Sequence, residues 1–436
     1  MYTKLGVLNT TAKTDNSFFS KTDIEKILKD IYDGKIDKGT IPEQLYAGTY
    51  KALSSAIDLG FGSIDYKTHD PELVYELKNN VATFSAFKSH VQQSDYHNLL
   101  VDESGKQRSW ASFRKEALKV DSTYNQQWLS AEYNLATRQA RSAKQWNQFE
   151  AKKDIYPNLQ YMPSRSAKQR DLHRQYYGRI FSIDDPIWNT IMPPNGWGCK
   201  CWVQQTRERV TDNSGIEPLL EVPGIAGNSG KTGTIFNASH PYVSKTGKTD
   251  KEAIRKQLNN LKELNKEFLS VKVGKNTLQI STLADRTDLN DNIEFITPFM
   301  LKYKEDFGIR EHSKIKSIKN PEYSYSDYKG DLTKYEGQDI KNFASRGFRK
   351  CSKGKQLGDE KECFLAFDFI GEISDLNIYD VASQFNSKLN YYRTKEDGRV
   401  RVNYILIKNG DKLSKIVNIE GLGTKAILQQ MKKELL

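Results

Sequence analysis

Hydrophobic and polar residues alternate in four different patterns along the chain. In residues 1–100, apolar residues between Asp23 and Ile31 recur at the i, i+3, i+4, i+7 spacing of one helix face. A second helix is predicted from Pro42 to Leu59, because proline suits a first helical turn and the glycine that follows Leu59 can end the helix. We therefore expect a helical N-terminal region.

The second section, residues 101–210, begins with helical spacing and then changes character. Apolar and small residues from Trp110 to Phe149 keep one helix face, and the small ones allow a neighbouring helix to approach closely. From Tyr156 onward the sequence is rich in Pro, Trp, Cys and His, which is typical of a loop-rich segment.

The third section, residues 211–309, is predicted to connect the others. Its Gly/Ser/Asn-rich run, residues 223–233, predicts a mobile loop or linker. The run contains Gly-Lys-Thr but lacks the first glycine and the preceding strand of a phosphate loop, which argues against nucleotide binding. A charged linking helix is expected from Lys251 to Leu269.

The last section, residues 310–436, is predicted to be an α+β module. Cys363 to Ile370 has the length and composition of a buried strand, and residues 399–419 predict a β-hairpin around Asn-Gly. Helices are expected at residues 378–389 and 424–435. The whole chain is therefore assigned to the α+β class, with helical N-terminal and central regions, a loop-rich Cys/His segment and a small C-terminal mixed sheet.

Composition narrows the class of protein further. The 23 Tyr, 19 Phe and 6 Trp argue against disorder, although charged residues make up 28% of the chain. The net charge of +11 is concentrated in residues 101–210, with 18 basic against 11 acidic residues, and in residues 301–436, with 26 against 20. This excess favours acidic partners such as nucleic acid. No apolar run reaches the ~18 residues of a membrane span, so no membrane partner is expected.

Two of the four cysteines suggest a metal site. Cys199 and Cys201 are too close for an unstrained disulfide, and with His173 they offer the thiolate and imidazole ligands that zinc prefers. Asp185, His240 or water are candidates for a fourth ligand. The alternative is that both cysteines are small buried residues and that His173 caps a turn.

Four stretches within residues 80–205 form an ordered series. They are Phe84-Ser-Ala-Phe-Lys88, Asp102-Glu-Ser-Gly105, Tyr124-Asn-Gln-Gln-Trp-Leu-Ser-Ala-Glu-Tyr133, and a segment that ends in Pro-Pro-Asn-Gly-Trp-Gly-Cys-Lys-Cys. The last stretch contributes Arg170, His173, Asp185, Trp188, Pro193, Pro194, Asn195, Gly196, Trp197, Cys199 and Cys201. This series resembles the phage Mu protein F-like minor head proteins, also called head-morphogenesis proteins. The resemblance implies a core at residues 101–210 that acts by binding rather than by catalysis.

Two positions depart from the pattern of that family. Relatives usually carry an acidic residue shortly before the position of Arg170, whereas residues 161–169 contain no carboxylate. Lys200 stands where an arginine is usual, so the charge is kept but the bidentate guanidinium is lost. If the acid completes a metal site or an ion pair in relatives, that interaction is altered here.

The order of strand, helix and hairpin after residue 363 is similar to the ends of contact-dependent inhibition toxins with a barnase/colicin-like nuclease fold. Cleavage of RNA needs a general base and cations around the scissile phosphate. The candidate catalytic residues are His312, Lys350, Lys353, Lys355, Arg399 and Arg401. Arg399 and Arg401 lie on the polar face of an alternating strand, and we favour the interpretation that they are simply solvated.

The preferred hypothesis is a phage or prophage minor capsid protein that acts during head assembly and DNA packaging. Its expected partners are portal and major capsid or scaffold proteins, packaged DNA, and RNA for the C-terminal module. Zinc is the candidate cofactor. The expected location is the virion head, and the host bacterial cytoplasm during assembly. The alternative hypothesis is a ribonuclease toxin at the C-terminus, carried by a non-enzymatic core.

Overall fold

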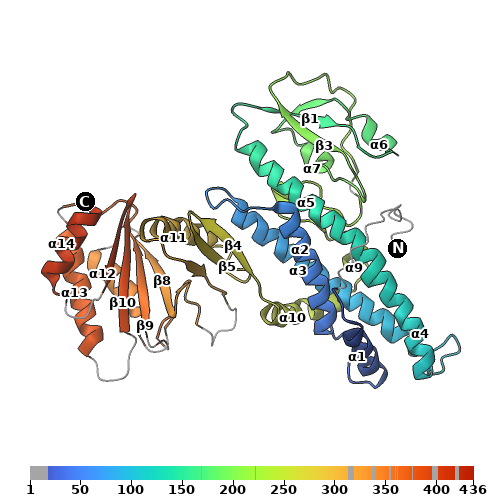
Figure 1. The fold of residues 1–436 in the computed structure, drawn as a ribbon, viewed down its shortest axis with the longest axis horizontal. Coiled ribbons are helices and arrows are strands. Elements are labelled where there is room, and N and C mark those ends of the chain that lie inside the picture. The colour runs from blue at the N-terminus through green and yellow to red at the C-terminus, as the bar shows by residue number, and fades with distance from the viewer. Residues whose placement is uncertain are drawn as a thin grey trace. The chain divides into compact units, whose positions relative to one another are not determined.

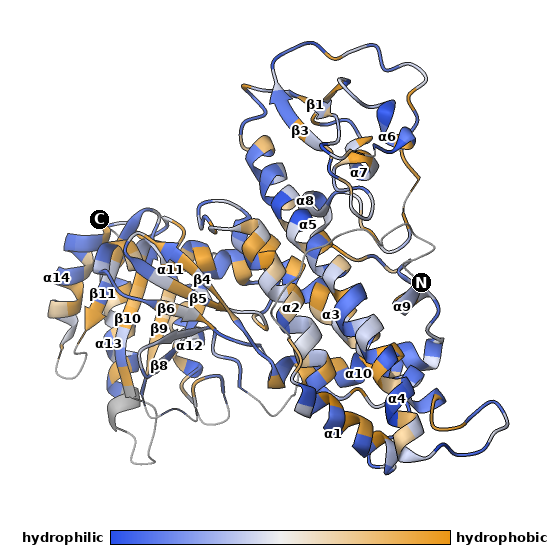
Figure 2. Cartoon of the chain, turned by 45° about the vertical axis from the view of Figure 1, so that its right-hand side comes forward, coloured by the Kyte–Doolittle hydropathy of each residue, from blue (hydrophilic) through white to orange (hydrophobic). Residues whose placement is uncertain are grey.

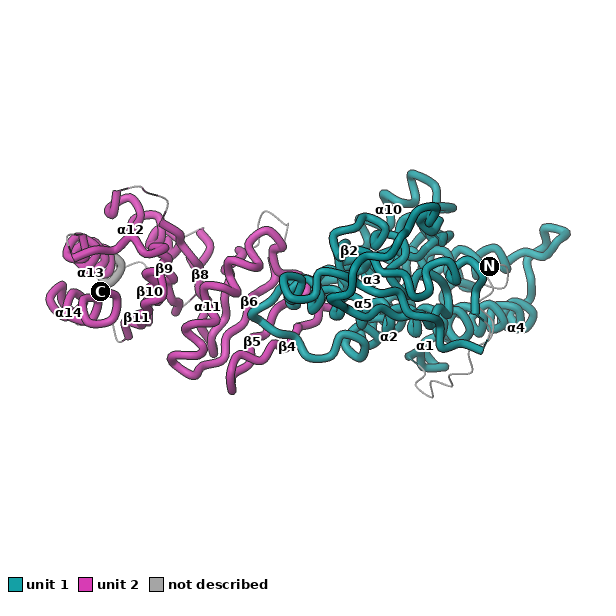
Figure 3. Tube along the Cα trace, turned by 90° about the horizontal axis from the view of Figure 1, so that it is seen from above, with its two compact units in different colours: residues 1–265 teal, residues 266–436 magenta. Residues whose placement is uncertain are grey.

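The computed structural model places the chain in two compact units, residues 1–265 (unit 1) and residues 266–436 (unit 2) (Figure 3). Each unit is described by itself. The structure describes residues 18–436 apart from residues 168, 221, 313–318, 336, 338, 353–354, 359, 361, 376, 395–400 and 418–421, and apart from the side chains of residues 391–394 and 401.

Long helices form the frame of unit 1 (Figure 1). Helix α2 lies against both α3 and α5. The bounds of the long helices are Lys21–Tyr32 for α1, Glu43–Phe61 for α2, Asp70–Asn98 for α3, Trp110–Asp121 for α4, Leu129–Glu150 for α5 and Lys248–Leu264 for α10.

The two helices predicted near the N-terminus are confirmed. Helix α1 is capped by Ser20, whose hydroxyl accepts a hydrogen bond from the Asp23 backbone nitrogen at 2.9 Å. Helix α2 continues past Gly60 and ends at Gly62, which has a φ of +74° that favours glycine. Gly60 has another task, because a Cβ there would lie 2.0 Å from the carbonyl oxygen of Thr137 in α5. The glycine thus permits close helix packing rather than helix termination.

A π-helical segment, η2 (Ser122–Trp128), joins α4 to α5. The apolar spacing predicted one continuous helix face here, and this wider turn is a feature that the spacing does not reveal. Single π-helical turns inside helices occur frequently at functional sites. Tyr124, in this segment, is buried.

The segment rich in Pro, Trp, Cys and His contains a small antiparallel sheet with the strand order β2-β1-β3. Its core is formed by aromatic and aliphatic side chains that include the fully buried Tyr161 and Trp188. The elements are β1 (Asn158–Met162), α6 (Asp171–Arg174), β2 (Ile180–Ser182), α7 (Trp188–Ile191) and β3 (Trp202–Thr206).

The prediction of a mobile loop or linker at residues 223–233 is wrong. Ile225 and Ala226 are buried, and α8 (Ser229–Thr232) packs on α5 with Gly230 directly against Trp146. Short glycine- and serine-rich runs form flexible linkers only when nothing covers them, and here a helix does. Helix α9 (Pro241–Ser244) follows.

The linking helix is also shorter than predicted. Helix α10 ends at Leu264, and Phe268, which was assigned to its apolar face, begins strand β4. The apolar spacing predicts too long a helix, because the apolar residues of strand β4, whose burial alternates, follow directly after those of the helix. Helix α10 belongs to unit 1, where Lys262 donates a hydrogen bond to Asn79 of α3 at 2.8 Å.

Unit 2 is built on one eight-stranded mixed sheet with the order β11-β10-β9-β8-β7-β6-β5-β4. The pairs β8–β9, β9–β10 and β5–β6 are parallel, and the other pairs are antiparallel. The strands are β4 (Phe268–Val273), β5 (Asn276–Ser281), β6 (Phe307–Ile309), β7 (Tyr323–Tyr325), β8 (Tyr328–Lys334), β9 (Glu362–Asp368), β10 (Arg401–Asn409) and β11 (Lys412–Val417).

Helices α12, α13 and α14 share an apolar core with strands β9, β10 and β11 (Figure 1). Figure 2 shows the hydrophobic residues that run along β9 and β10. The helices of unit 2 are α11 (Leu289–Tyr303), α12 (Ile340–Arg349), α13 (Ile378–Thr394) and α14 (Thr424–Leu435).

The predicted strand after Cys363, the hairpin and the two C-terminal helices are all confirmed. The α+β class is confirmed as well. The sheet extends further than the predicted module, because β4, β5 and β6 precede residue 310 and belong to it.

Candidate functional site

His173, Cys199 and Cys201 come together in unit 1 from separate short elements. His173 lies on α6, and both cysteines lie in the turn that leads into β3. The His173 Nδ1 atom is 3.8 Å from the Cys199 sulfur and 3.6 Å from the Cys201 sulfur. All three ligand atoms lie within 4.8 Å of one another. His173 and Cys199 are buried and Cys201 is partly exposed.

These separations suit a tetrahedral metal ion. With Zn–S of about 2.3 Å and Zn–N of about 2.0 Å, tetrahedral geometry puts a nitrogen and a sulfur ligand about 3.5 Å apart. The observed distances of 3.6 and 3.8 Å are close to that value. The three side chains can therefore hold a metal ion.

The two thiols also influence each other's acidity. A hydrogen bond from Cys199 lowers the pKa of Cys201 to about 4. The same pairing, and then burial, raises the pKa of Cys199 well above its usual value. The pairing therefore favours the thiolate form at Cys201 and the thiol form at Cys199.

The two protein side chains considered for a fourth ligand are not part of this group. Asp185 accepts a hydrogen bond from the Ile187 backbone nitrogen at 2.9 Å and so caps the turn before α7. His240 is buried among aromatic rings, and its Nδ1 accepts from the Tyr242 backbone nitrogen. Within the described parts of the chain, His173, Cys199 and Cys201 form the one group of three or more such ligands. A fourth ligand would be water or another molecule.

Asn195 joins the cluster to the core of the small sheet. Its side-chain nitrogen donates to the Tyr161 hydroxyl at 3.2 Å and to the Ile191 carbonyl at 2.9 Å. Its side-chain oxygen accepts from the Cys199 sulfur at 3.3 Å. The polar partners around a metal ligand usually orient it, and Asn195 does so here.

Arg170 holds the glycine-rich turn of the same segment. Its guanidinium donates to the Trp197 carbonyl, and a Cβ on Gly196 would lie 2.3 Å from the guanidinium nitrogen. Any side chain at Gly196 would therefore displace the arginine. Trp188, another residue of the motif, is fully buried and donates to the Ser182 carbonyl at 2.9 Å.

Helix α5 fastens the Pro-Pro-Asn-Gly-Trp-Gly-Cys segment from the other side. Ser142 donates to the Pro193 carbonyl at 2.6 Å, and Gln139 donates to the Pro194 carbonyl at 2.9 Å. Arg138 donates to the Cys199 carbonyl. The sequence analysis did not single out these three side chains. The stripe of small residues around them indicated close packing of this helix, but not its partner.

A second buried cluster uses the earlier stretches of the series. Lys88 of α3 donates to the Tyr124 carbonyl in η2 at 2.8 Å and to Glu132 at 2.5 Å, and both charged side chains are fully buried. Tyr242 donates to the other oxygen of Glu132 at 3.2 Å. Phe84 stacks on Phe236 with ring centroids 3.8 Å apart. These residues join α3, η2, α5 and α9 into one scaffold.

Lys200, one of the two departures from the family pattern, lies at the surface. Lys200 is exposed, and its carbonyl accepts from the Arg165 backbone nitrogen at 3.3 Å. The Arg165 guanidinium lies 4.9 Å from the centroid of the Trp202 ring. In the stretch that lacks the family's carboxylate, this cation stacks on an aromatic face.

The described candidate catalytic residues of unit 2 have separate surroundings. His312 lies 3.4 Å from Asp285, Lys350 is bound to Asp331, and Lys355 is exposed. Lys353, Arg399 and the side chain of Arg401 lie outside the described residues. The ribonuclease alternative therefore stays a hypothesis that rests on the strand pattern.

Comparison with known proteins identifies the segment that contains the cluster. Residues 104–204 match the family model described as Phage Mu protein F like protein. The chain contains a Mu protein F-like region. That region includes the His173, Cys199 and Cys201 cluster, η2 and α5.

Two curated relatives agree with this assignment. Over 117 residues the chain is 31% identical to the putative capsid assembly protein F of Escherichia phage Mu, a match that covers 26% of this chain and 27% of the relative. Over 64 residues it is 36% identical to the Mu-like prophage FluMu F protein of Haemophilus influenzae, covering 15% of this chain and 16% of the relative. The similarity thus spans about a quarter or less of these relatives.

Two further comparisons complete the description. No solved structure matches the chain. Among the described residues, no helix combines the length and the apolar character that crossing a membrane requires.

Proposed function

We propose that this chain is a minor capsid protein of a phage or prophage, which binds portal and major capsid or scaffold proteins during head assembly. The observation that carries the proposal is the way the Mu F-like region uses its motif. Arg170, Gln139 and Ser142 bond to backbone carbonyls and hold the Pro193–Cys201 segment in place. Side chains that bond to backbone carbonyls fix the position of that backbone. An assembly protein requires a rigid surface of this kind to bind its partners.

The surface beside the cluster offers a contact for such a partner. Leu172 is 72% exposed although its neighbour His173 is buried. Single exposed leucines are common on protein surfaces, and Leu172 is chosen as the contact because it lies beside the segment that Arg170 and α5 hold. The proposed site of action is the virion head, with assembly in the host bacterial cytoplasm. The basic excess of residues 101–210 would favour contact with packaged DNA, and such binding would weaken as salt rises.

Deletion of the gene and a surface variant test this function. Without the protein, we expect no DNA-filled heads in electron micrographs of lysates. Leu172→Gln should reduce copurification of the full chain with portal or coat protein, whereas Leu220→Gln, a 90% exposed leucine outside the matched region, should not. Infectious particles from the deletion strain would contradict the proposal.

We also infer that the ion held by His173, Cys199 and Cys201 is zinc. Two sulfur ligands and one imidazole favour zinc over the hard cations, which prefer oxygen. When bound, the ion would link α6 to the turn before β3 and so stabilise the segment that Arg170 and α5 hold from outside.

Metal analysis of the purified full chain tests the zinc. We expect about one zinc per chain, with loss of the metal in Cys201→Ser and retention in Cys363→Ser, a cysteine of unit 2. Occupancy below about one-tenth in the wild-type protein would refute the zinc but leave the assembly role standing.

A further inference from the structure

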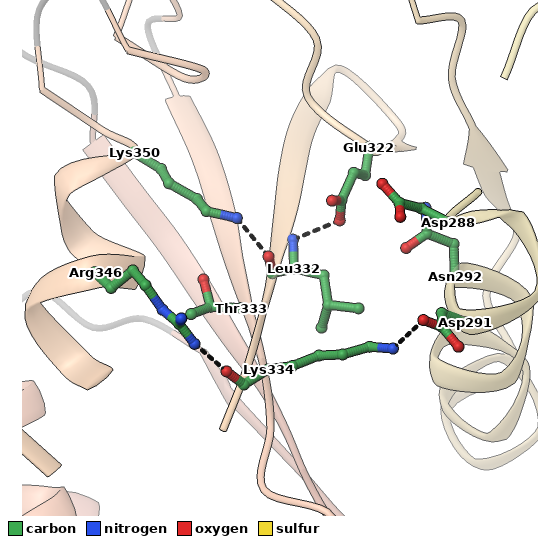
Figure 4. A pocket seen from close by; sticks show the side chains of 9 residues that line it. All are labelled: Asp288, Asp291, Asn292, Glu322, Leu332, Thr333, Lys334, Arg346 and Lys350. Atoms are coloured by element: carbon green, nitrogen blue, oxygen red, sulfur yellow. Dashed lines mark hydrogen bonds and ion pairs between the residues drawn. The ribbon is translucent and has the colours of Figure 1, made fainter. Parts of the chain in front are cut away.

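Unit 2 contains a polar cavity that the proposed assembly role does not use. Its volume is about 300 Å³, and it lies among α11, β8, α12 and the residues just before β7 (Figure 4). That volume is at the lower end of the range for small-molecule sites, which is roughly 300–1,000 Å³. A small ligand therefore fits.

Charges of opposite sign face each other across this cavity. Figure 4 shows Lys350 and Arg346 of the α12 side opposite Glu322 and Asp288, with Lys334 reaching over to Asp291 of α11. Three acidic and three basic side chains line the cavity, and Lys350 is also paired with Asp331, so positive and negative charges are nearly balanced. Such a cavity suits a ligand with one positive and one negative end better than a polyanion.

The charged side chains are held in place by bonds within unit 2. Lys350 donates to Asp331, which is 2% exposed, and to the Leu332 carbonyl. Glu322 accepts from the Leu332 backbone nitrogen at 2.8 Å. Arg346 donates to the Lys334 carbonyl. The walls are thus preorganised, which lowers the entropic cost of binding.

One buried polar group points to a missing partner. The hydroxyl oxygen of Thr333 has no hydrogen-bond partner among the residues that the structure describes, although Thr333 is only 4% exposed. Buried hydroxyls are normally bonded, and a ligand in the cavity would satisfy this one.

The lining also excludes other ligand classes. Among the described residues, no aromatic ring lines the cavity, so a nucleobase would find no stacking partner. The three cations are balanced by the carboxylates of Asp288, Asp291 and Asp331, which does not suit a nucleic-acid phosphate backbone. Within the described part of the chain, Asp288, Asp291 and Glu322 do not form a group of three ligands around one point.

We propose that this cavity binds a small zwitterion that carries an amine and a carboxylate, the chemistry of a free amino acid. The carboxylate would lie against Arg346 and the Thr333 hydroxyl, and the amine against Asp288 and Glu322. Burial, and then the charge of Asp331, raises the pKa of Glu322 to about 8. Near neutral pH its carboxyl group is therefore largely protonated, which leaves Asp288 as the negative charge for the amine.

Calorimetric titration of the full-length protein tests this site. The probes are L-glutamine, L-glutamate and L-lysine. Three further probes are controls: succinate lacks the amine, 1,4-diaminobutane lacks the carboxylate, and adenosine monophosphate adds a nucleobase. We expect at least one amino acid to bind at least tenfold more tightly than succinate and diaminobutane. No binding by any of the three amino acids, or tighter binding of the nucleotide, would overturn the proposal.

Variants show whether the cavity is the site. Arg346→Met and Thr333→Val should each weaken amino-acid binding at least tenfold, whereas Thr333→Ser keeps the hydroxyl and should bind nearly as the wild type. Arg349→Met, an exposed arginine on the same helix outside the cavity, is the matched control. Unchanged binding in Arg346→Met protein with an unchanged circular dichroism spectrum would overturn the proposal.

Discussion

Each unit pairs a lysine with a buried carboxylate, but the surroundings of the two pairs differ. Lys88 and Glu132 in unit 1 are both completely buried, and a tyrosine hydroxyl and a backbone carbonyl complete their bonds. In unit 2 the side chain of Asp331 is 3% exposed, but that of Lys350 is 22% exposed and lines the cavity. The first pair closes a scaffold, whereas the second forms part of the wall of a site.

The difference has a physical cause. Burial lowers the pKa of Lys88, with Glu132 acting in the opposite direction, so this charge depends on one carboxylate at a place closed to solvent. Burial raises the pKa of Asp331, with Lys350 acting in the opposite direction, but water in the cavity can reach this lysine. The same pair of residue types therefore gives rigidity in one place and an adaptable polar surface in the other.

The largest expected effect is the loss of the sealed pair. Glu132→Ala leaves Lys88 buried without its counter-charge and should lower the free energy of unfolding of unit 1 by about 3–5 kcal/mol. All six tryptophans lie between residues 110 and 202, so tryptophan fluorescence in a urea titration follows unit 1 alone.

The double variant Lys88→Met/Glu132→Leu should recover much of this stability, because apolar residues of similar volume often replace a buried pair without loss. Asp184→Asn, which removes an exposed partner of Lys153, is the control and should unfold like the wild type. If the Glu132→Ala protein were as stable as this control, the buried Lys88–Glu132 pair would not stabilise unit 1, and the distinction between the two pairs would be contradicted.

A smaller effect is expected for the pair that faces the cavity. Lys350→Met leaves Asp331 buried without its donor and should cost about 1–3 kcal/mol, since Asp331 can take up a proton or bond to water. Hydrogen–deuterium exchange of peptides from β8 and α12 measures the change in unit 2. A loss as large as that of Glu132→Ala would show that the cavity wall is as rigid as the sealed pair.

The smallest effect in acid is expected from Glu322→Gln, because glutamine resembles the protonated carboxyl group. The pKa of Glu322 is raised to about 8, so between its ordinary pKa and about 8 the folded state holds a proton that the unfolded chain has lost. Its contribution to stability is therefore complete in acid and is lost as pH rises through about 8. Exchange in β8 should depend less on pH in Glu322→Gln than in the wild type.

The contribution of His240 to the stability of unit 1 should change with pH in the opposite direction. Burial, and then the charge of Lys88, lowers the pKa of His240 to about 3, so the folded state keeps a neutral ring that the unfolded chain protonates below its ordinary pKa. Stability from this residue is lost as pH falls toward about 3. His240→Asn keeps a capping side chain at α9 and should flatten the acid limb of the tryptophan-monitored stability curve. If the acid limb were unchanged in this variant, the loss of stability in acid would come from groups other than His240.

Local patterns were enough to place several of the regular elements. The apolar spacing of α1, the proline at the start of α2 and the alternation in the β10–β11 hairpin each depend on neighbours within a few residues. Two of the wrong predictions have a common cause. Gly60 and residues 223–233 were interpreted as a helix end and a linker, but both are positions where another element, α5, approaches closely.

The sequence by itself determined the ligand types of the candidate metal centre and the family of residues 104–204, because the order of Arg, His, Trp and Cys residues is visible without coordinates. Only the tertiary structure decided which side chains surround that centre and hold its segment. Asn195 reaches the cluster, whereas Asp185 caps a turn and His240 lies among aromatic rings. The cavity of unit 2 likewise cannot be predicted from a sequence pattern, because Glu322, Thr333 and Arg346 meet only when a loop, a strand and a helix fold together.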